Sequence, residues 1–514
     1  CTTFRLPTLG RATLAEAMAT SPTEAPPQYG DEDPTRLAGP AAGVVLVVLF
    51  CTALGAAADR WRAQSVPKLG RGGVLMHGWV VGMLVSSYAM LIPGLVSNLF
   101  ASRTDFVIFG MPTSLSEWDE TMLSLIGRLW DDGMHAGCIL VTVYAIIIPM
   151  LKVGLLLLGH RWQHGSPRHV LWARLCIRAV QVISKWACPD MFAYILLTCL
   201  MRGLNKPPNL RSGMVLNMGF TCFSVFCVAS TVSSLGIRLP EAPAQEVSVE
   251  SASAESRKSP YRMGSGVAAV VVTLLAACFG GLLVDGLTRP SMSLHLDMDL
   301  LFKARPDLEV LAPVIRRFNL GELLQKRVSV WQCIVELCGW IGEGEVNSAI
   351  ALALYAVFAV VMPVVDMALI LFAAIVGTRS AKSPSASRLP RRALALSAKL
   401  RKLEMLDVSI MGSFVVVLSL SSMREKGVLV EACTGAVKLL LAEVCHFLAA
   451  WVAEAAAAAA PGAVEPAKAE VAPEAVKAEQ EGTPDWQVVK GTTLCIDDLK
   501  QMCHPQEGAV VATV

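Results

Sequence analysis

The length of the apolar runs is the feature that most constrains the fold of this chain. Its hydrophobic residues, 54% of the 514, gather in long stretches and only 17% of the residues are charged. A soluble domain carries about 25% charged residues. The stretches are about 18–25 residues long, and an α-helix needs about 20 residues to cross the hydrocarbon of a bilayer. The pattern predicts an all-α, polytopic membrane protein.

Two parts of the chain repeat the same order of unusual residues. In each part an apolar run contains a proline and, three positions later, a charged residue; a basic connector follows, and an aspartate opens the next apolar run. These positions are Pro149, Lys152 and Asp190 in the first copy and Pro363, Asp366 and Asp407 in the second. A pattern repeated in the same order indicates a duplicated module. We therefore expect two modules of four transmembrane helices each, arranged as a parallel repeat.

The composition along the chain divides it into six parts. We expect a disordered segment at 1–40, a hydrophobic segment at 41–58, a first module at 72–238, a polar linker at 239–262, a second module at 263–453 and a low-complexity cytosolic tail at 454–514. The expected membrane helices cover 74–96, 138–158, 187–201, 214–236, 264–287, 349–376, 405–422 and 428–453. The segment 41–58 fits either a signal-like sequence or an additional transmembrane helix.

The charges of the loops predict the orientation of the helices. The connector after 138–158 and the connector at 377–402 are both rich in Lys and Arg, whereas the loop at 97–133 is acidic. Short basic loops stay in the cytosol. Four helices return the chain to its starting side, so both modules have the same orientation, and the loop at 288–345 is non-cytosolic. That loop has enough apolar periodicity for one or two short amphipathic helices. Arg202, Lys206 and Arg211 run against this rule.

Several classes of function find no support in the sequence. The net charge is only +2, which gives no electrostatic reason to expect a nucleic-acid partner. The fifteen Cys form no CxxC pair, and His160, His164 and His169 lack a fourth ligand, so we expect no metal and no cofactor. No nucleophile, Walker or metalloprotease motif lies outside the apolar runs, so we do not expect an enzyme.

Lys152 and Asp366 are charged residues that lie within apolar runs. A charge at the centre of a membrane helix costs about 2.5–3.5 kcal/mol on insertion scales, which makes each residue a functional candidate. One interpretation places the two side chains opposite each other, or in a hydrated groove, between the modules. The alternative for Lys152 is that its long side chain reaches the headgroups.

The remaining candidates lie at the ends of the apolar runs. Asp190 and Asp407 either stabilise helix N-termini or form ion pairs with Lys185 and Lys402. Pro149 and Pro363 are either hinges that kink their helices or ordinary membrane prolines. The candidates for contact between a connector and lipid headgroups are Lys185, Trp186, Arg391, Arg392 and Lys402, although basic loops also serve simply to set topology.

Taken together, these motifs resemble the paraquat-inducible protein A family over roughly residues 72–453. The likeness is carried by the P-x-x-K that ends in Lys152, by Lys185 with Trp186, by Asp190, and by the second copy's Met405-Leu406-Asp407-Val408. Three features depart from the family pattern. The CxxC zinc ribbons are missing. In the second copy Asp366 replaces the lysine and Leu403 replaces the tryptophan, and the two ends of the chain are of low complexity.

The resemblance implies a bacterial inner-membrane protein, or a eukaryotic organellar relative, that takes part in lipid trafficking. Its expected partners are membrane lipids and an MCE-type lipid-tunnel protein on the non-cytosolic side, docked on the loops at 97–133 and 288–345. Two alternatives remain open. Asp366 within paired modules suits a small-solute or proton-coupled transporter, and the polar linker and tail suit a membrane scaffold for partner proteins.

Overall fold

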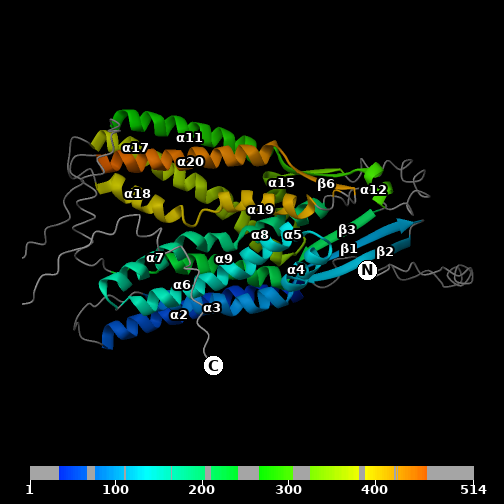
Figure 1. The fold of residues 1–514 in the computed structure, drawn as a ribbon, viewed down its shortest axis with the longest axis horizontal. Coiled ribbons are helices and arrows are strands. Elements are labelled where there is room, and N and C mark those ends of the chain that lie inside the picture. The colour runs from blue at the N-terminus through cyan, green and yellow to red at the C-terminus, as the bar shows by residue number, and fades with distance from the viewer. Residues whose placement is uncertain are drawn as a thin grey trace, which may run out of the picture. The chain divides into compact units, whose positions relative to one another are not determined.

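A computed structural model describes most of the two predicted modules (Figure 1). It describes residues 34–65, 76–108, 111–163, 165–202, 210–240, 265–304, 325–380, 388–421, 424 and 427–459. Most of the predicted disordered segment, polar linker and low-complexity tail lies outside the described residues.

The first half of the structure is a set of helices with one small sheet. Its elements are α2 (Pro34–Ser65), α3 (Gly78–Val96), β1 (Asn98–Ile108), β2 (Met111–Thr121), α4 (Met122–Asp131), α5 (His135–Thr142), the π-helix η1 (Val143–Ile147), α6 (Ile148–Trp162), α7 (Pro167–Ile183), the 3₁₀ turn η2 (Ser184–Ala187), α8 (Pro189–Arg202), β3 (Leu210–Leu216) and α9 (Met218–Leu235). Helices α3 and α9, the first and last of the predicted module, pack against each other.

The second half has elements of the same kinds. They are α11 (Ser265–Thr288), β4 (Pro290–Leu296), α12 (Met298–Ala304), β5 (Lys326–Ser329), α15 (Val330–Gly342), α16 (Val346–Ala353), the π-helix η5 (Leu354–Val361), α17 (Met362–Ser380), α18 (Arg388–Leu400), α19 (Leu406–Leu420), β6 (Val428–Ala432) and α20 (Thr434–Ala459). Again the first and last long helices, α11 and α20, pack against each other.

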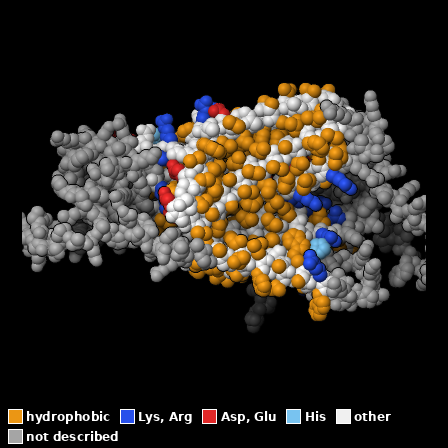
Figure 2. All heavy atoms as spheres, turned by 180° about the vertical axis from the view of Figure 1, so that it is seen from behind, with side chains coloured by type: hydrophobic (Ala, Val, Ile, Leu, Met, Phe, Trp, Pro, Cys, Tyr) orange, Lys and Arg blue, Asp and Glu red, His pale blue; other side chains and the backbone are white. Residues whose placement is uncertain are grey.

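The fold class is as the sequence predicts, an all-α polytopic membrane protein. Among the described residues, seven helical stretches are long and apolar enough to cross a bilayer. Their outward side chains are apolar, as Figure 2 shows for one face, and exposed residues include Leu46, Ile92, Leu157, Val284 and Trp451. Apolar surface on this scale is stable in lipid but not in water.

The third apolar run of each half differs from the prediction. Helix α8 has 14 residues and α19 has 15, and at 1.5 Å per residue each covers only about 21–23 Å of a hydrocarbon core about 30 Å thick. The basic connector before each run is itself helical: α7 packs along α6, and α18 packs along α17 (Figure 1). The third segment of each half is therefore a broken helix, and not a continuous span preceded by a surface loop.

Two three-stranded antiparallel sheets were not predicted from the sequence. The first has the order β2-β1-β3 and the second β5-β4-β6. The predicted loop at 97–133 is a β-hairpin followed by α4, whose first turn is capped by Thr121 and Ser124. The amphipathic helix expected within 288–345 is present as α15. Figure 1 shows both sheets at the same end of the helices.

Helix α2 packs tightly on α3, which supports the transmembrane alternative for 41–58. A Cβ on Gly55 would overlap the backbone of Gly78, and one on Gly82 would overlap the carbonyl of Cys51. Close approach through small residues is typical of helix pairs in membranes. In addition, the backbone N–H of Gly78 donates to Asp59 Oδ2 over 2.6 Å.

Polar groups connect the two halves near the sheets. The Asn347 amide donates to the Leu216 carbonyl over 2.7 Å and accepts from Thr221 Oγ1 over 2.6 Å. Arg202 forms an ion pair with Glu345 and lies over the Trp340 ring, 4.1 Å from its centroid. The charge of Arg202, which runs against the loop-charge rule, is thus neutralised inside the fold.

Candidate functional site

Each of the two second spans contains a π-helix immediately before its proline. Pro149 and Pro363 are the second residues of α6 and α17, directly after η1 and η5. Proline has no backbone N–H, so it cannot donate a hydrogen bond to the preceding turn of the helix. The irregularity that the sequence predicted at both prolines therefore takes the form of a π-helical turn.

In the second half, a backbone carbonyl of this irregular turn forms a hydrogen bond with the broken helix, at the break between α18 and α19. The Met362 N–H donates to the Val357 carbonyl, five residues back. Continuing that pattern would pair the Phe358 carbonyl with Pro363, which has no N–H. The Phe358 carbonyl instead accepts a 3.0 Å hydrogen bond from the N–H of Met405. The break between α18 and α19 is thus attached to the middle of the span that carries Asp366.

Lys152 is completely buried within the first half. Its Nζ donates to the Ser230 carbonyl on α9 over 2.8 Å. This position excludes the interpretation in which the lysine reaches the headgroups. It also corrects the predicted pairing with Asp366, because the described contacts of Asp366 are with other residues. Each of the two charges is held by the last long helix of its own half.

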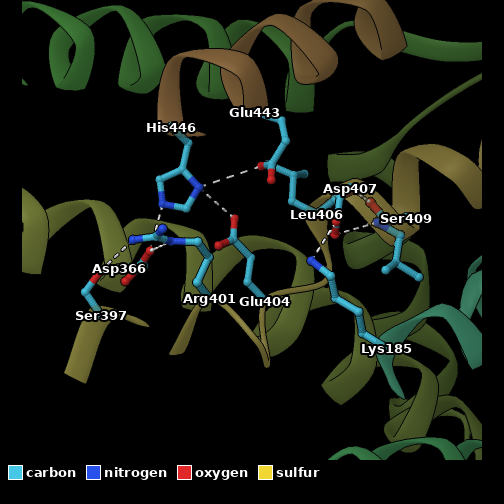
Figure 3. Close-up of polar contacts among 11 residues, drawn as sticks. Lys185, Asp366, Ser397, Arg401, Glu404, Leu406, Asp407, Ser409, Glu443 and His446 are labelled. Atoms are coloured by element: carbon cyan, nitrogen blue, oxygen red, sulfur yellow. Dashed lines mark hydrogen bonds and ion pairs between the residues drawn. The ribbon is translucent and has the colours of Figure 1, made fainter. Parts of the chain in front are cut away.

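Asp366 belongs to a buried cluster at the middle of the second half (Figure 3). Its Oδ2 lies 2.9 Å from His446 Nε2 on α20 and 3.6 Å from Arg401 Nε at the helix break. Arg401 also contacts the half-exposed Glu454, with Nη1 3.1 Å from Oε1. Three segments therefore meet here: α17, α20 and the end of α18.

Two further carboxylates face the other side of the His446 ring. Glu404 Oε1 lies 3.1 Å and Glu443 Oε2 lies 3.9 Å from His446 Nδ1. All three side chains are buried. Figure 3 shows the imidazole between Asp366 on one side and the two glutamates on the other. Neither glutamate forms a hydrogen bond through these atoms within the described structure.

Lys185 and Lys402 connect the two broken helices. Lys185 Nζ lies 2.6 Å from Asp407 Oδ2, and Lys402 Nζ donates to Gln181 Oε1 over 2.7 Å. The sequence predicted ion pairs of these lysines with Asp190 and Asp407 as one of two alternatives. One such pair is present, and it joins the first half to the second.

Asp190 has a different environment from Asp407. It lies in the first turn of α8 and is completely buried, and neither carboxylate oxygen has a hydrogen-bond partner in the described structure. Lys185 lies five residues before Asp190, and Lys402 lies five residues before Asp407. Lys402 forms its hydrogen bond with Gln181. The predicted ion pair is therefore not formed at Asp190.

The remaining connector candidates lie in two kinds of place. Trp186 is partly buried and packs against the apolar core, whereas Arg391 and Arg392 on α18 are exposed. Lys185 and Lys402 are occupied by the contacts described above. Headgroup binding by the two arginines stays a prediction.

Sequence reasoning missed His446, Glu404, Glu443 and Arg401. A signal was present for two of them, because Glu443 and His446 lie three residues apart within the last apolar run and so share a helix face. Glu404 and Arg401 looked like part of a basic surface connector. Only the break in the helix turns them inward, and the sequence did not show that break.

Comparison with known families tests the resemblance. Residues 82–235 match the family model described as paraquat-inducible protein A. This chain carries a paraquat-inducible protein A module. The matched range runs from α3 to the end of α9, so it includes Lys152, Asp190 and the helix break of the first half. The paraquat-inducible protein A match does not extend to the His446 cluster.

Two further comparisons add no relatives. No curated protein and no solved structure matches the chain.

Proposed function

We propose that this protein is a membrane subunit of a lipid-trafficking system. The observation that carries the proposal is the match of the first half to paraquat-inducible protein A. The seven helical stretches among the described residues of both halves that are long and apolar enough to cross a bilayer agree with it. The family resemblance implies that the protein acts together with an MCE-type protein that conducts lipid between two membranes. In this role the chain itself catalyses no covalent chemistry.

We also propose that the second half is a diverged copy of the first. The order of elements supports this. In each half, the strand after the first long helix is the centre of a sheet, and the strand before the last long helix is one of its edges. In each half, the second span also contains a π-helix followed by a proline. The two halves then have the same polarity in the membrane, as expected for a parallel repeat.

The two sheets offer a surface for a partner protein. They lie at the same end of the helices (Figure 1). The basic connections from α6 to α7 and from α17 to α18 lie at the opposite end. By the charge rule, the basic end is cytosolic, so the sheets face the non-cytosolic side, where an MCE-type tunnel would dock. The outer strands, β2 and β3 in the first sheet and β5 and β6 in the second, are the strands at which a partner would pair through main-chain groups.

Photo-crosslinking tests lipid handling directly. A photoreactive amino acid is placed at Leu157 and at Val361, on the two second spans, and at Leu46 and Trp451 as controls on α2 and α20. All four side chains are exposed. Captured lipid is identified by mass spectrometry. We expect the second-span positions to capture phospholipid with a headgroup composition different from that of the bulk bilayer. A composition equal to that captured by the controls would count against a lipid pathway.

The buried His446 cluster favours a second candidate function, a proton-coupled transporter. An imidazole held between carboxylates at the middle of a span is an arrangement that relays protons in membrane proteins. Proteoliposomes with an imposed pH gradient test this candidate. Gradient-driven proton uptake that is lost in Asp366→Asn, without lipid capture from the second spans, would favour this candidate over lipid trafficking.

A further inference from the structure

We propose that Glu404, Glu443 and His446 bind one divalent cation of the zinc type, with Asp366 as the residue that orients the imidazole. The proposal is independent of lipid trafficking. The ligand atoms of Asp366, Glu404 and His446 lie within 4.8 Å of one another, and all three residues are buried. Imidazole with carboxylates is a donor set suited to zinc and related divalent ions.

The geometry around His446 Nδ1 fits an ion between three donors. Zinc binds nitrogen and carboxylate oxygen at about 2.0–2.2 Å, so two donors of a tetrahedral site lie about 3.3–3.6 Å apart. His446 Nδ1 lies 3.1 Å from Glu404 Oε1 and 3.9 Å from Glu443 Oε2. These two separations lie on either side of the tetrahedral value. An ion held by His446 Nδ1 and Glu404 would be completed by Glu443 if its side chain moved toward Nδ1.

The atoms without hydrogen-bond partners point to the same place. Buried side-chain atoms that lack such a partner in the described structure include His446 Nδ1, both carboxylate oxygens of Glu404, and Glu443 Oε2. Leaving a buried polar atom unsatisfied costs about 1–3 kcal/mol, and more for a charged group. Four such atoms in one cluster indicate that the site binds something besides protein.

The opposite side of the ring is already arranged as in known metal sites. His446 Nε2 lies 2.9 Å from Asp366 Oδ2, which fixes the ring and leaves Nδ1 for an ion. A histidine that ligates a metal commonly donates its other ring N–H to a carboxylate. Asp366 therefore acts as a positioning residue through His446.

A divalent cation would balance the charges of the cluster. Asp366, Glu404 and Glu443 carry three negative charges when ionised, and Arg401 carries one positive charge, which leaves −2 when His446 is neutral. Uncompensated charge in a low-dielectric interior is very costly. One divalent ion neutralises the cluster. It also ties the helix break at Glu404 to α20, and through Asp366 to α17.

Polar contacts extend from the cluster toward the end of α20. The Arg401 side chain, in contact with Asp366, is 20% exposed, and its other partner Glu454 is 52% exposed. Arg401 and Glu454 therefore form a polar route between the cluster and the end of α20.

Metal binding to the full-length protein in detergent tests the proposal. The protein is stripped with a chelator and titrated with Zn²⁺, and the bound metal is measured by mass spectrometry. We expect about one Zn²⁺ per chain. In His446→Gln, Glu404→Gln and Glu443→Gln the affinity should fall at least about tenfold, and in Asp366→Asn about 10–100-fold with the stoichiometry unchanged. The controls His169→Gln and Glu431→Gln change exposed residues and should bind as the unaltered protein does.

A second variant separates loss of the site from loss of the fold. His446→Cys supplies a thiolate at the same position, so its Co²⁺ complex should show an intense thiolate-to-cobalt absorption band that the unaltered protein lacks. The proposal is overturned if the unaltered protein binds no Zn²⁺. It is also overturned if His446→Gln binds as tightly as the controls, or if His446→Cys gives no thiolate band.

Discussion

Removing Lys185 should destabilise the contact between the two halves. Its ion pair with Asp407 is short, at 2.6 Å, and the two side chains are only 13% and 16% exposed. Removing one partner from a fully buried pair costs about 3–5 kcal/mol, because the other charge stays buried without compensation. The remaining exposure lets water reduce this penalty. We therefore expect Lys185→Met to lower the free energy of unfolding by about 2–4 kcal/mol.

A double-mutant cycle measures the pair itself. In Lys185→Met/Asp407→Leu both charges are gone, so most of the lost stability should return, with a coupling energy of about 1–3 kcal/mol. The assay is reversible unfolding in mixed micelles, followed by tryptophan fluorescence. Arg289→Met is the matched control, because the Arg289–Asp285 pair is 55% and 41% exposed and such pairs contribute about 0–1 kcal/mol. A coupling energy of zero for Lys185 and Asp407, or equal losses in Lys185→Met and the control, would refute this reasoning.

Three further predictions concern packing, the contact between the halves and the helix break. Gly82→Leu should separate α2 from α3, because its side chain would overlap a carbonyl of α2; faster proteolysis of α2 in detergent would show this. Asn347→Ala removes two buried hydrogen bonds between the halves and should lower the free energy of unfolding by about 2–4 kcal/mol. The control Asn98→Ala removes an exposed hydrogen bond and should lower it by less than about 1 kcal/mol. Pro363→Ala restores an N–H that competes for the carbonyl bound by Met405, so hydrogen exchange of the Met405 amide should become faster; an unchanged rate would contradict the role given to the proline.

Much of the fold could be predicted because its main determinant is the length of the apolar runs. Helices α3, α9 and α11 lie within a few residues of their expected ranges, since each is one uninterrupted run, whereas α20 lies six residues later than expected because β6 occupies Val428–Ala432. The prolines at 149 and 363 marked the irregular turns, because an imino acid disturbs any helix regardless of its surroundings. The family resemblance rested on short motifs in fixed order, and the comparison with known families supports it over the first half.

Partners across the fold could not be predicted. Lys152 and Asp366 were matched because they have opposite charge at equivalent positions, but equivalence in sequence does not bring two residues together. Lys152 donates to Ser230 and Asp366 contacts His446, each across a helix contact that depends on side-chain packing. The sheets were missed because β1 pairs with β3, about a hundred residues later in the chain, and no local pattern records that pairing.

The helix breaks were the most important feature that the sequence concealed. If the connectors were surface loops, the residues from Arg401 to Glu404 would not be expected to lie near His446. Once α18 packs along α17, Glu404 and Arg401 reach the His446 cluster and Lys402 contacts the first half, whereas Arg391 and Arg392 stay exposed.

Labelling of single cysteines in intact membranes tests most directly whether the two halves cross the bilayer with the same polarity. Cysteines replace Arg161, Arg391, Asp131 and Glu343 one at a time, in a background in which the fifteen cysteines of the chain are changed to alanine or serine, and are treated with an impermeant maleimide. The account predicts that positions 161 and 391 react from one face and positions 131 and 343 from the other. Reaction of 161 and 391 from opposite faces would contradict it.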